Sequence, residues 1–256
     1  MNEKSKLIIK LAGIVIEIHL LFQYTRTLCE NYVIINDEQI SPDIIVDIVP
    51  RNILRENDET QINRGRADNE LKLFFNPGYL ESFAVQRKIC EAMPLFGAFL
   101  MHGTVVAMNG RGYMFTAPSG TGKTTRAKIW LEEYPDSFIV NGDKPLLGIT
   151  DNDVIAYGTP WCGKEHWNAN IGVPLQAIYI LERTAPGEDN SIKEIEMTEA
   201  FDMLVKQAYI PEDTRAMINT ISLLKSLEGK VKMYVFRSAP TKEAVHLAFN
   251  TACPQN

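Results

Sequence analysis

The chain has 256 residues, with 32 acidic and 26 basic side chains, a formal net charge of −6 and a pI near 5.4. Hydrophobic residues make up 45% and charged residues 23%, which is ordinary globular composition and excludes extended disorder, collagen and coiled coil. The acidic balance argues against a dedicated nucleic-acid-binding protein, which would carry a basic patch, but leaves room for a local basic pocket that binds a small anion.

The cysteines and the N-terminal segment bear on the compartment. The four cysteines form no C-x-x-C pair, so neither a zinc ribbon nor a dense disulfide frame is expected, and we predict reduced thiols in a cytoplasmic protein. The apolar stretch at 7–22 is interrupted by Lys10, Glu17 and His19 and has no small-residue cleavage site. This argues against a signal peptide and against a bilayer span, so no membrane partner is expected.

The first 75 residues are predicted to be mostly strand, because short apolar runs alternate with polar residues. Residues 51–70 are rich in Asn, Asp, Glu and Arg and are predicted to be a polar surface loop or hairpin. The candidate strands are 15–21, 32–35, 43–49 and 71–75.

Helices begin after this region. Asn76-Pro77 is a good helix start, and Pro94 sets the end of that helix. Apolar runs at 98–108 and 112–116 are joined by Asn109-Gly110, which predicts a hairpin. The later elements are a helix from 124 to Pro135, strands at 137–140, 175–181 and 231–236, helices at 198–209 and 212–227, and a last helix capped by Thr241.

Strands and helices therefore mix throughout, which predicts an α/β protein with a mixed sheet and helices packed on it. We expect one domain over 1–256, since no Pro/Gly/Ser linker separates independent parts. Its segments are a strand-rich N-terminal extension at 1–75 joined to the core, a core at 95–183, and C-terminal helices and a strand at 195–256.

The strongest motif is Ala-Pro-Ser-Gly-Thr-Gly-Lys-Thr-Thr at 117–125, between a predicted strand and a predicted helix. This is the context that a phosphate-binding loop requires. Gly120 and Gly122 permit backbone angles that a side chain forbids, so successive N–H groups can turn around an anion at the helix N-terminus. Lys123 can reach the transferring phosphate oxygens, and the Thr124 hydroxyl suits Mg²⁺.

One position departs from the general pattern, because Ala117 stands where the first glycine is expected. The alternative interpretation is a tight strand–helix turn with a surface lysine. On the phosphate-loop interpretation we predict that ATP and Mg²⁺ bind here. The predicted nucleotide-binding residues are Ser119, Gly120, Thr121, Gly122, Lys123, Thr124 and Thr125.

His102-Gly103 lies at the far end of the strand that precedes the hairpin. A two-residue hairpin returns the chain, so His102 can lie near the phosphate loop. The alternative is a histidine with no chemical role.

The segments at 102–106 and 119–124 together resemble the catalytic domain of HPr kinase/phosphorylase. The loop at 119–125 is also similar to that of ATP-dependent phosphoenolpyruvate carboxykinase, and the two families share a catalytic core with a mixed sheet. The resemblance covers roughly 95–181, about a third of the chain. It implies that His102 lies beside the catalytic carboxylates.

A strand that ends in Asp143, about 20 residues after the loop lysine, is where a metal-associated carboxylate belongs. The resembled kinases carry two adjacent aspartates here, whereas this chain has Gly142-Asp143 preceded by Asn141, so the family's proposed base is missing. Either Asp143 serves both roles, or His102 assists, or a loose transition state needs little base help. The alternative is a turn with solvated side chains.

The segment at 158–167 is dense in chemically capable residues. Glu165 resembles the glutamate that follows the aspartates in HPr kinases, which implies a second metal ligand, and Lys164 can contact phosphate. Cys162 and His166 supply only two zinc ligands, too few for a site. A packed loop is the alternative to a substrate-binding loop.

Two arginines have open interpretations. Arg183, after the strand at 175–181, is placed either for phosphate recognition or for an exposed ion pair at a strand end. Arg87 is placed equally well to pair with a carboxylate or to bind a ligand.

These observations predict a Mg-dependent phosphotransferase that moves a phosphoryl group from ATP to a hydroxyl of a small molecule or protein. The alternatives are an enzyme like phosphoenolpyruvate carboxykinase and a non-catalytic nucleotide-binding regulator. The expected partners are the nucleotide and the acceptor, with a homo-oligomer possible and no nucleic acid. The predicted catalytic residues are His102, Lys123 and Asp143, and the predicted metal ligands are Thr124, Asp143 and Glu165.

Overall fold

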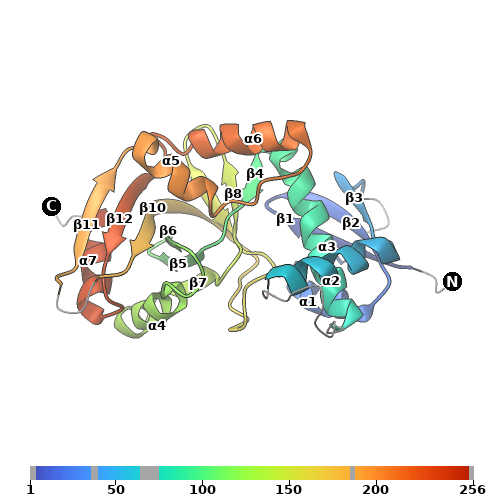
Figure 1. Ribbon diagram of the computed structural model, residues 1–256, viewed down its shortest axis with the longest axis horizontal. Coiled ribbons are helices and arrows are strands. Elements are labelled where there is room, and N and C mark those ends of the chain that lie inside the picture. The colour runs from blue at the N-terminus through green and yellow to red at the C-terminus, as the bar shows by residue number, and fades with distance from the viewer. Residues whose placement is uncertain (1–3, 36–39, 64–74, 185–187, 254–256) are drawn as a thin grey trace. The chain divides into compact units, whose positions relative to one another are not determined.

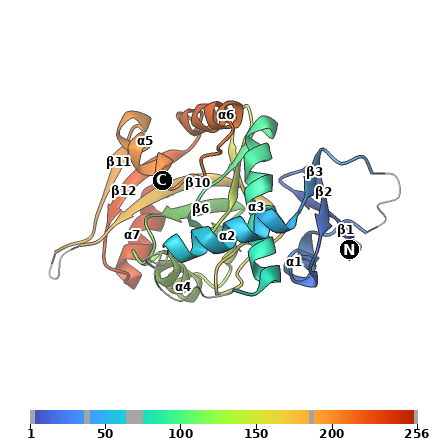
Figure 2. The same cartoon turned by 45° about the vertical axis from the view of Figure 1, so that its right-hand side comes forward.

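The computed structural model describes residues 4–35, 40–63, 75–184 and 188–253. The chain divides into two compact units, Met1–Ala92 and Met93–Asn256 (Figures 1 and 2). Among the described residues, no helix has the length and apolar character needed to cross a membrane.

The first unit is a three-stranded sheet with helices. Its central strand, β2, pairs antiparallel with β1 and parallel with β3. The β1–β2 turn is Ala12-Gly13, and both residues have positive φ, +50° and +85°. The elements are β1 (Ser5–Leu11), β2 (Ile14–Leu20), α1 (Gln23–Leu28), η1 (Glu30–Tyr32), β3 (Ile44–Asp47), α2 (Pro50–Asn63) and α3 (Pro77–Ala92).

The prediction of a polar loop or hairpin at 51–70 is wrong, because α2 occupies most of that range. Two carboxylates of α2, Glu56 and Glu59, accept hydrogen bonds from Arg87 on α3. The helix is therefore stabilised by a partner 31 positions away in the sequence, which a local reading of its polar composition misses. Arg87 pairs with carboxylates, one of the two roles expected for it.

Three further expectations for the N-terminal region need correction or fall outside the structure. Residues 32–35 form no strand; η1 ends at Tyr32, and Val33 makes a single bridge to Ile9. The predicted strand at 71–75 lies outside the described residues, except for Phe75. The N-terminal strands do not extend the large sheet, since β1, β2 and β3 form a sheet of their own.

The second unit contains a nine-stranded mixed sheet, which confirms the predicted α/β mixed-sheet class. Its elements are η2 (Met93–Phe96), β4 (Ala98–Leu100), β5 (Thr104–Met108), β6 (Arg111–Thr116), α4 (Lys123–Glu133), β7 (Phe138–Asn141), β8 (Leu146–Ile149), β9 (Val154–Tyr157), β10 (Gly172–Glu182), β11 (Ser191–Ile195), α5 (Met197–Val205), α6 (Thr214–Lys225), β12 (Lys232–Arg237) and α7 (Lys242–Ala252).

The long strand β10 organises this sheet. It pairs in parallel with β6 on one side and with β12 on the other, while its first residues pair antiparallel with β9. β5 lies antiparallel between β6 and β7, so β7 runs in the direction of β6. The carboxyl ends of β6, β7, β10 and β12 consequently meet at one edge of the sheet, the usual place for a ligand site in α/β proteins.

Helices cover both faces of the large sheet. One core contains Met114 and Ile178 of the sheet with Leu204 of α5 and Leu224 of α6. The opposite core joins alternate sheet residues to Trp130 of α4 and to α7. Figure 1 shows α5 and α6 on one side of the strands and α4 and α7 on the other. Successive residues of a strand therefore point alternately into the two cores, as expected for a sheet buried on both faces.

Several local predictions for this unit are confirmed. Asn109 and Gly110 form the hairpin turn between β5 and β6, with φ of +53° and +73°. Thr241 accepts a hydrogen bond from the amide of Ala244 and caps α7. The run at 98–108 is not one strand, because the chain leaves β4, which pairs with β8, and enters β5, which pairs with β6 and β7.

A buried carboxylate holds the first unit together locally. Glu81 of α3 is fully buried and accepts hydrogen bonds from the Leu21 amide at 2.6 Å, the Phe22 amide at 3.3 Å and the Thr25 hydroxyl at 3.1 Å. Phe22 is the N-cap of α1 and supplies no side-chain cap; Glu81 binds the two amides that precede the helix and the Thr25 hydroxyl in its first turn. Burial raises the pKa of Glu81 and outweighs the three hydrogen bonds, which lower it.

The Glu81→Gln variant should lose about 1–3 kcal/mol of unfolding free energy, because one carboxylate oxygen becomes an NH₂ group that faces a donor and cannot accept its hydrogen bond. The loss should depend on pH. Since the folded pKa lies above the unfolded one, the carboxyl stabilises the fold fully below the ordinary glutamate range and less as pH rises through the raised pKa. Urea unfolding of both proteins at several pH values measures this, and a difference that grows with pH would contradict it.

Candidate functional site

The glycine-rich loop lies between the end of β6 and the start of α4, as the motif predicts. Gly120 and Gly122 have φ of +79° and +100°, the left-handed region that favours glycine. A Cβ atom on Gly122 would lie 2.8 Å from Nη1 of Arg126, so this position has neither the dihedral nor the space for a side chain.

The N-terminus of α4 is open toward the loop. Gly122 is its N-cap and, having no side chain, supplies no side-chain cap for the amides of the first turn. Thr124 is half-buried and Thr125 is exposed. Unoccupied amides at the positive end of a helix are the groups that bind a phosphate.

Lys123 is the first residue of α4 and is buried, with 7% of its surface exposed. Its Nζ donates hydrogen bonds to the carbonyl oxygens of Ala117 at 2.8 Å and Pro118 at 3.3 Å. Burial lowers the pKa of Lys123, while the nearby Asp143 carboxylate raises it. The ammonium therefore lies inside the loop and within electrostatic reach of Asp143, which the sequence predicts as a metal ligand.

Arg126 lies directly beneath the loop and was not among the predicted site residues. Its guanidinium is 1% exposed and donates to the carbonyl oxygens of Thr121 and Gly122, at 3.1 and 3.4 Å, and to Ser238 after β12. Burial lowers its pKa to about 10. The sequence gives one indication of this role: Arg126 is a charged residue next to Ala127 and Trp130, on the side of the helix that faces the core.

A third basic side chain also binds the loop backbone. Arg183, just after β10, donates a hydrogen bond to the carbonyl oxygen of Gly120. The preceding residue, Glu182, forms an exposed ion pair with Arg237 at 2.6 Å. Lys123, Arg126 and Arg183 thus engage carbonyl groups of the loop. The Thr121 amide donates to the Pro118 carbonyl at 3.4 Å, and amide groups are the part of such a loop that binds an anion.

His102 and Asp143 lie together at the same edge of the sheet. His102 Nε2 is 3.3 Å from Asp143 Oδ1, and the backbone amide of Gly103 donates to the Asp143 carbonyl at 2.8 Å. The hydroxyl of Thr116, the last residue of β6, donates to the carbonyl oxygen of His102 at 2.8 Å. The hairpin therefore returns His102 to the start of the loop, as expected.

The surroundings of the Asp143 side chain favour its ionised form. Burial alone would raise its pKa, but the hydrogen bond with His102 and the charges of Lys144, His102 and Lys123 outweigh that effect and hold the pKa below the usual aspartate range. Asp143 is half-buried, so the carboxylate remains accessible. An ionised carboxylate oxygen is a kind of ligand that Mg²⁺ prefers.

Asn141 and Gly142 explain why the site has one aspartate here. Asn141 is fully buried; its Oδ1 accepts from the amides of Asp143 and Lys144, and its Nδ2 donates to Thr159. A Cβ on Gly142 would lie 2.7 Å from the Cys162 carbonyl oxygen. Position 142 therefore has no room for a second carboxylate, and Asn141 builds the turn that presents Asp143.

The segment at 158–167 lies against α4 and Asp143, but its predicted ligands are not gathered. Glu165 Oε1 is 3.9 Å from Lys128 Nζ, and no interaction found among the described residues joins it to Thr124 or Asp143. Cys162 is buried and 3.5 Å from the Asn168 amide, while His166 is exposed. The described parts of the chain contain no group of three or more His, Cys, Asp or Glu residues that could hold a metal.

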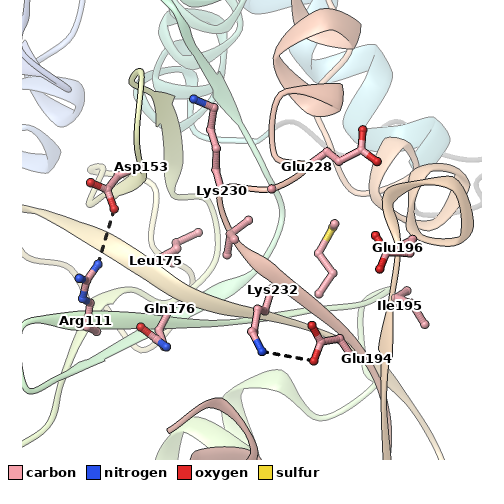
Figure 3. A pocket seen from close by; sticks show the side chains of 13 residues that line it. Arg111, Asp153, Leu175, Gln176, Glu194, Ile195, Glu196, Glu228, Lys230 and Lys232 are labelled. Carbon is pink, nitrogen blue, oxygen red and sulfur yellow. Dashed lines mark hydrogen bonds and ion pairs between the residues drawn. The ribbon is translucent and has the colours of Figure 1, made fainter.

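The pocket drawn in Figure 3 lies at the other end of the sheet. Arg111, one of its lining residues, begins β6, whereas the glycine-rich loop follows the end of that strand. Arg111 pairs with Asp153 at 3.6 Å and Lys232 pairs with Glu194 at 3.4 Å. These four charges pair with one another. Because the pocket lies at the opposite end of β6 from the glycine-rich loop, it is separate from the candidate site.

Comparisons with known proteins add little to this geometry. No protein-family model matches the chain, and no curated protein matches it. Among solved structures, the Hpr(Ser) kinase/phosphatase from Coxiella burnetii is similar at a TM-score of 0.34 and 8% identity, over 59% of this chain and 93% of that one. A likeness at this TM-score carries no argument about family or activity, so the resemblance found in the sequence stays a prediction.

The Gly122→Ala variant should bind ATP at least about tenfold more weakly, because the methyl group strains a left-handed residue and displaces Arg126. Gly110→Ala is the matched control, since Gly110 has φ +73° with open space around it and lies in the hairpin turn. Calorimetric titration with ATP and Mg²⁺ compares the two. Equal affinity for both variants would show that the loop geometry does not bind the nucleotide.

Proposed function

We propose that this chain is a nucleotide-dependent phosphotransferase, and more particularly a kinase of the HPr kinase-like type that uses ATP and Mg²⁺. The observation that carries the proposal is the position of Asp143 and His102 beside the glycine-rich loop, with Lys123 buried inside that loop. A loop of this kind alone binds phosphate; a carboxylate and an imidazole next to it provide for the transfer of the terminal phosphoryl group.

In this proposal the loop holds the polyphosphate. The amides around Gly120 and Gly122 and the first turn of α4 surround the phosphate oxygens. Lys123 exchanges its hydrogen bonds with the loop carbonyls for hydrogen bonds with the transferring phosphoryl oxygens. Lys123 is then the main protein charge that opposes the negative charge developing there.

The residues present fit a magnesium ion that is shared with a phosphate better than a metal ion that is held by protein ligands alone. Mg²⁺ is held typically by one or two protein oxygens together with phosphate oxygens and waters, so a group of three protein ligands is not needed. Thr124 and Asp143 are the residues that would hold it, through a hydroxyl and an ionised carboxylate. When bound, the ion neutralises charge on the phosphate oxygens. Glu165 as a further ligand stays a prediction.

His102 and Asp143 are proposed to act on the acceptor side. Asp143 accepts a hydrogen bond from His102 beside the loop. Because Gly142 leaves no space for a second aspartate, any help in removing the acceptor proton falls to this pair. A loose transition state asks little of such a base, so one carboxylate with one imidazole is sufficient. The acceptor is proposed to be a hydroxyl on a small molecule or protein.

The same absence of space at Gly142 favours one other candidate, a regulator that binds nucleotide without catalysis. That candidate shares the loop and differs only in turnover. The carboxykinase-like alternative draws no specific support from the described residues.

The Lys123→Met variant should lose phosphoryl transfer by about 100-fold or more, because its buried ammonium is the charge that the proposal places on the transferred group. The control is Lys193→Met, an exposed lysine on β11 that pairs with Glu199. Transfer from γ-labelled ATP is measured against a panel of polyols, sugars and serine-containing proteins. Tight ATP binding by wild type with no transfer and no hydrolysis would instead support the regulator.

A further inference from the structure

Gln207 lies beside His102 although 105 residues separate them in the sequence. It follows α5, where its amide donates to the carbonyl oxygen of Leu204 at 2.9 Å. The segment then runs along β4: the His102 amide donates to the Gln207 carbonyl at 2.8 Å, and the Tyr209 amide donates to the Leu100 carbonyl at 2.9 Å. The backbone at Gln207 is therefore held without help from its side chain.

The side chain of Gln207 contacts the ring that the proposed function uses. His102 Nδ1 is 3.2 Å from Gln207 Oε1, while Nε2 is 3.3 Å from Asp143 Oδ1. Each nitrogen of the ring thus has one partner, one from the segment after α5 and one from the turn after β7. Two contacts on opposite sides of a ring fix its plane, whereas one contact would leave it free to turn.

The two partners differ in what they can accept or donate. An ionised carboxylate only accepts, so Nε2 carries a proton toward Asp143. A glutamine amide offers an oxygen at one end and an NH₂ group at the other, and a half-turn about its Cγ–Cδ bond exchanges them. Gln207 can therefore pair Nδ1 whether or not that nitrogen carries a proton, and the Nε2–H contact with Asp143 is preserved in both cases.

We propose that Gln207 is a positioning residue that fixes the orientation of the His102 ring, so that Nε2 faces Asp143 and carries its proton there, beside the glycine-rich loop. Its contribution to turnover rests on the proposed kinase function; its effect on the ring does not. Partners of this kind, which contact a functional histidine without contacting substrate, change activity by about 10- to 100-fold when they are removed.

The test compares Gln207→Met, which keeps the length of the side chain and removes the amide, with Lys206→Met at the adjacent exposed position. Protein labelled with ¹⁵N-histidine contains four such residues, and a His102→Gln variant identifies the His102 signals. The ring ¹⁵N shifts, recorded well above pH 7 where imidazoles are neutral, report which nitrogen carries the proton. The kcat for transfer and the KM for ATP are measured on the same proteins.

We expect the wild type and Lys206→Met to show His102 protonated at Nε2, and Gln207→Met to show a mixture of the two tautomers. In Gln207→Met, kcat should fall about 10- to 100-fold while the KM for ATP is unchanged. An unchanged tautomer in Gln207→Met overturns the proposal, whatever happens to kcat. A changed tautomer with full kcat overturns the role in turnover. If the wild type transfers no phosphoryl group, the proposed function fails, and the ¹⁵N shifts still decide whether Gln207 positions the ring.

Discussion

The buried guanidinium of Arg126 ties the glycine-rich loop to the chain after β12. A fully buried cation is stable only where hydrogen-bond acceptors surround it, and here the acceptors are the backbone carbonyls of Thr121 and Gly122 and the oxygens of Ser238. The loop cannot move away from β12 without leaving that charge unsatisfied. Its conformation is therefore set before any anion arrives, which reduces the ordering that binding must bring about.

Three cationic side chains form hydrogen bonds with the carbonyl groups of the loop and not with its amide groups. Side chains of Lys123, Arg126 and Arg183 bind carbonyl groups, and they come from α4 and from the end of β10. Carbonyls that are already engaged cannot repel a polyphosphate as strongly as free ones would, and the positive charges lie close behind them. In a chain of net charge −6, this local concentration of basic groups is an exception, and it favours an anion at the loop.

The direction of the strands explains why distant residues gather here. β6, β10 and β12 run in parallel, and β7 runs with them, so their carboxyl ends deliver the loop, Asp143, Arg183 and Ser238 to one edge. β5 runs the opposite way, so its beginning, next to His102, reaches the same edge. Close packing then limits the chemistry: the Cys162 carbonyl excludes a side chain at Gly142, and one carboxylate remains beside the imidazole.

Features set by neighbouring residues could be predicted from the sequence. Two glycines and a lysine between a strand and a helix define the loop, Asn109-Gly110 defines the hairpin, and Thr241 defines a helix start, because dihedral preferences and caps act over a few residues. The proximity of His102 to the loop followed from the hairpin in the same way.

Features that depend on residues far apart in the chain could not be predicted from the sequence. The helix at α2 depends on Arg87, the tie beneath the loop depends on Ser238, and the second contact of the His102 ring depends on Gln207. The separation of β1, β2 and β3 into their own sheet is of the same kind. By itself, the sequence determined which residues can turn around a phosphate; only the tertiary structure decided which side chains hold them there, because hydrogen bonds and packing join residues by distance in space rather than by order in the chain.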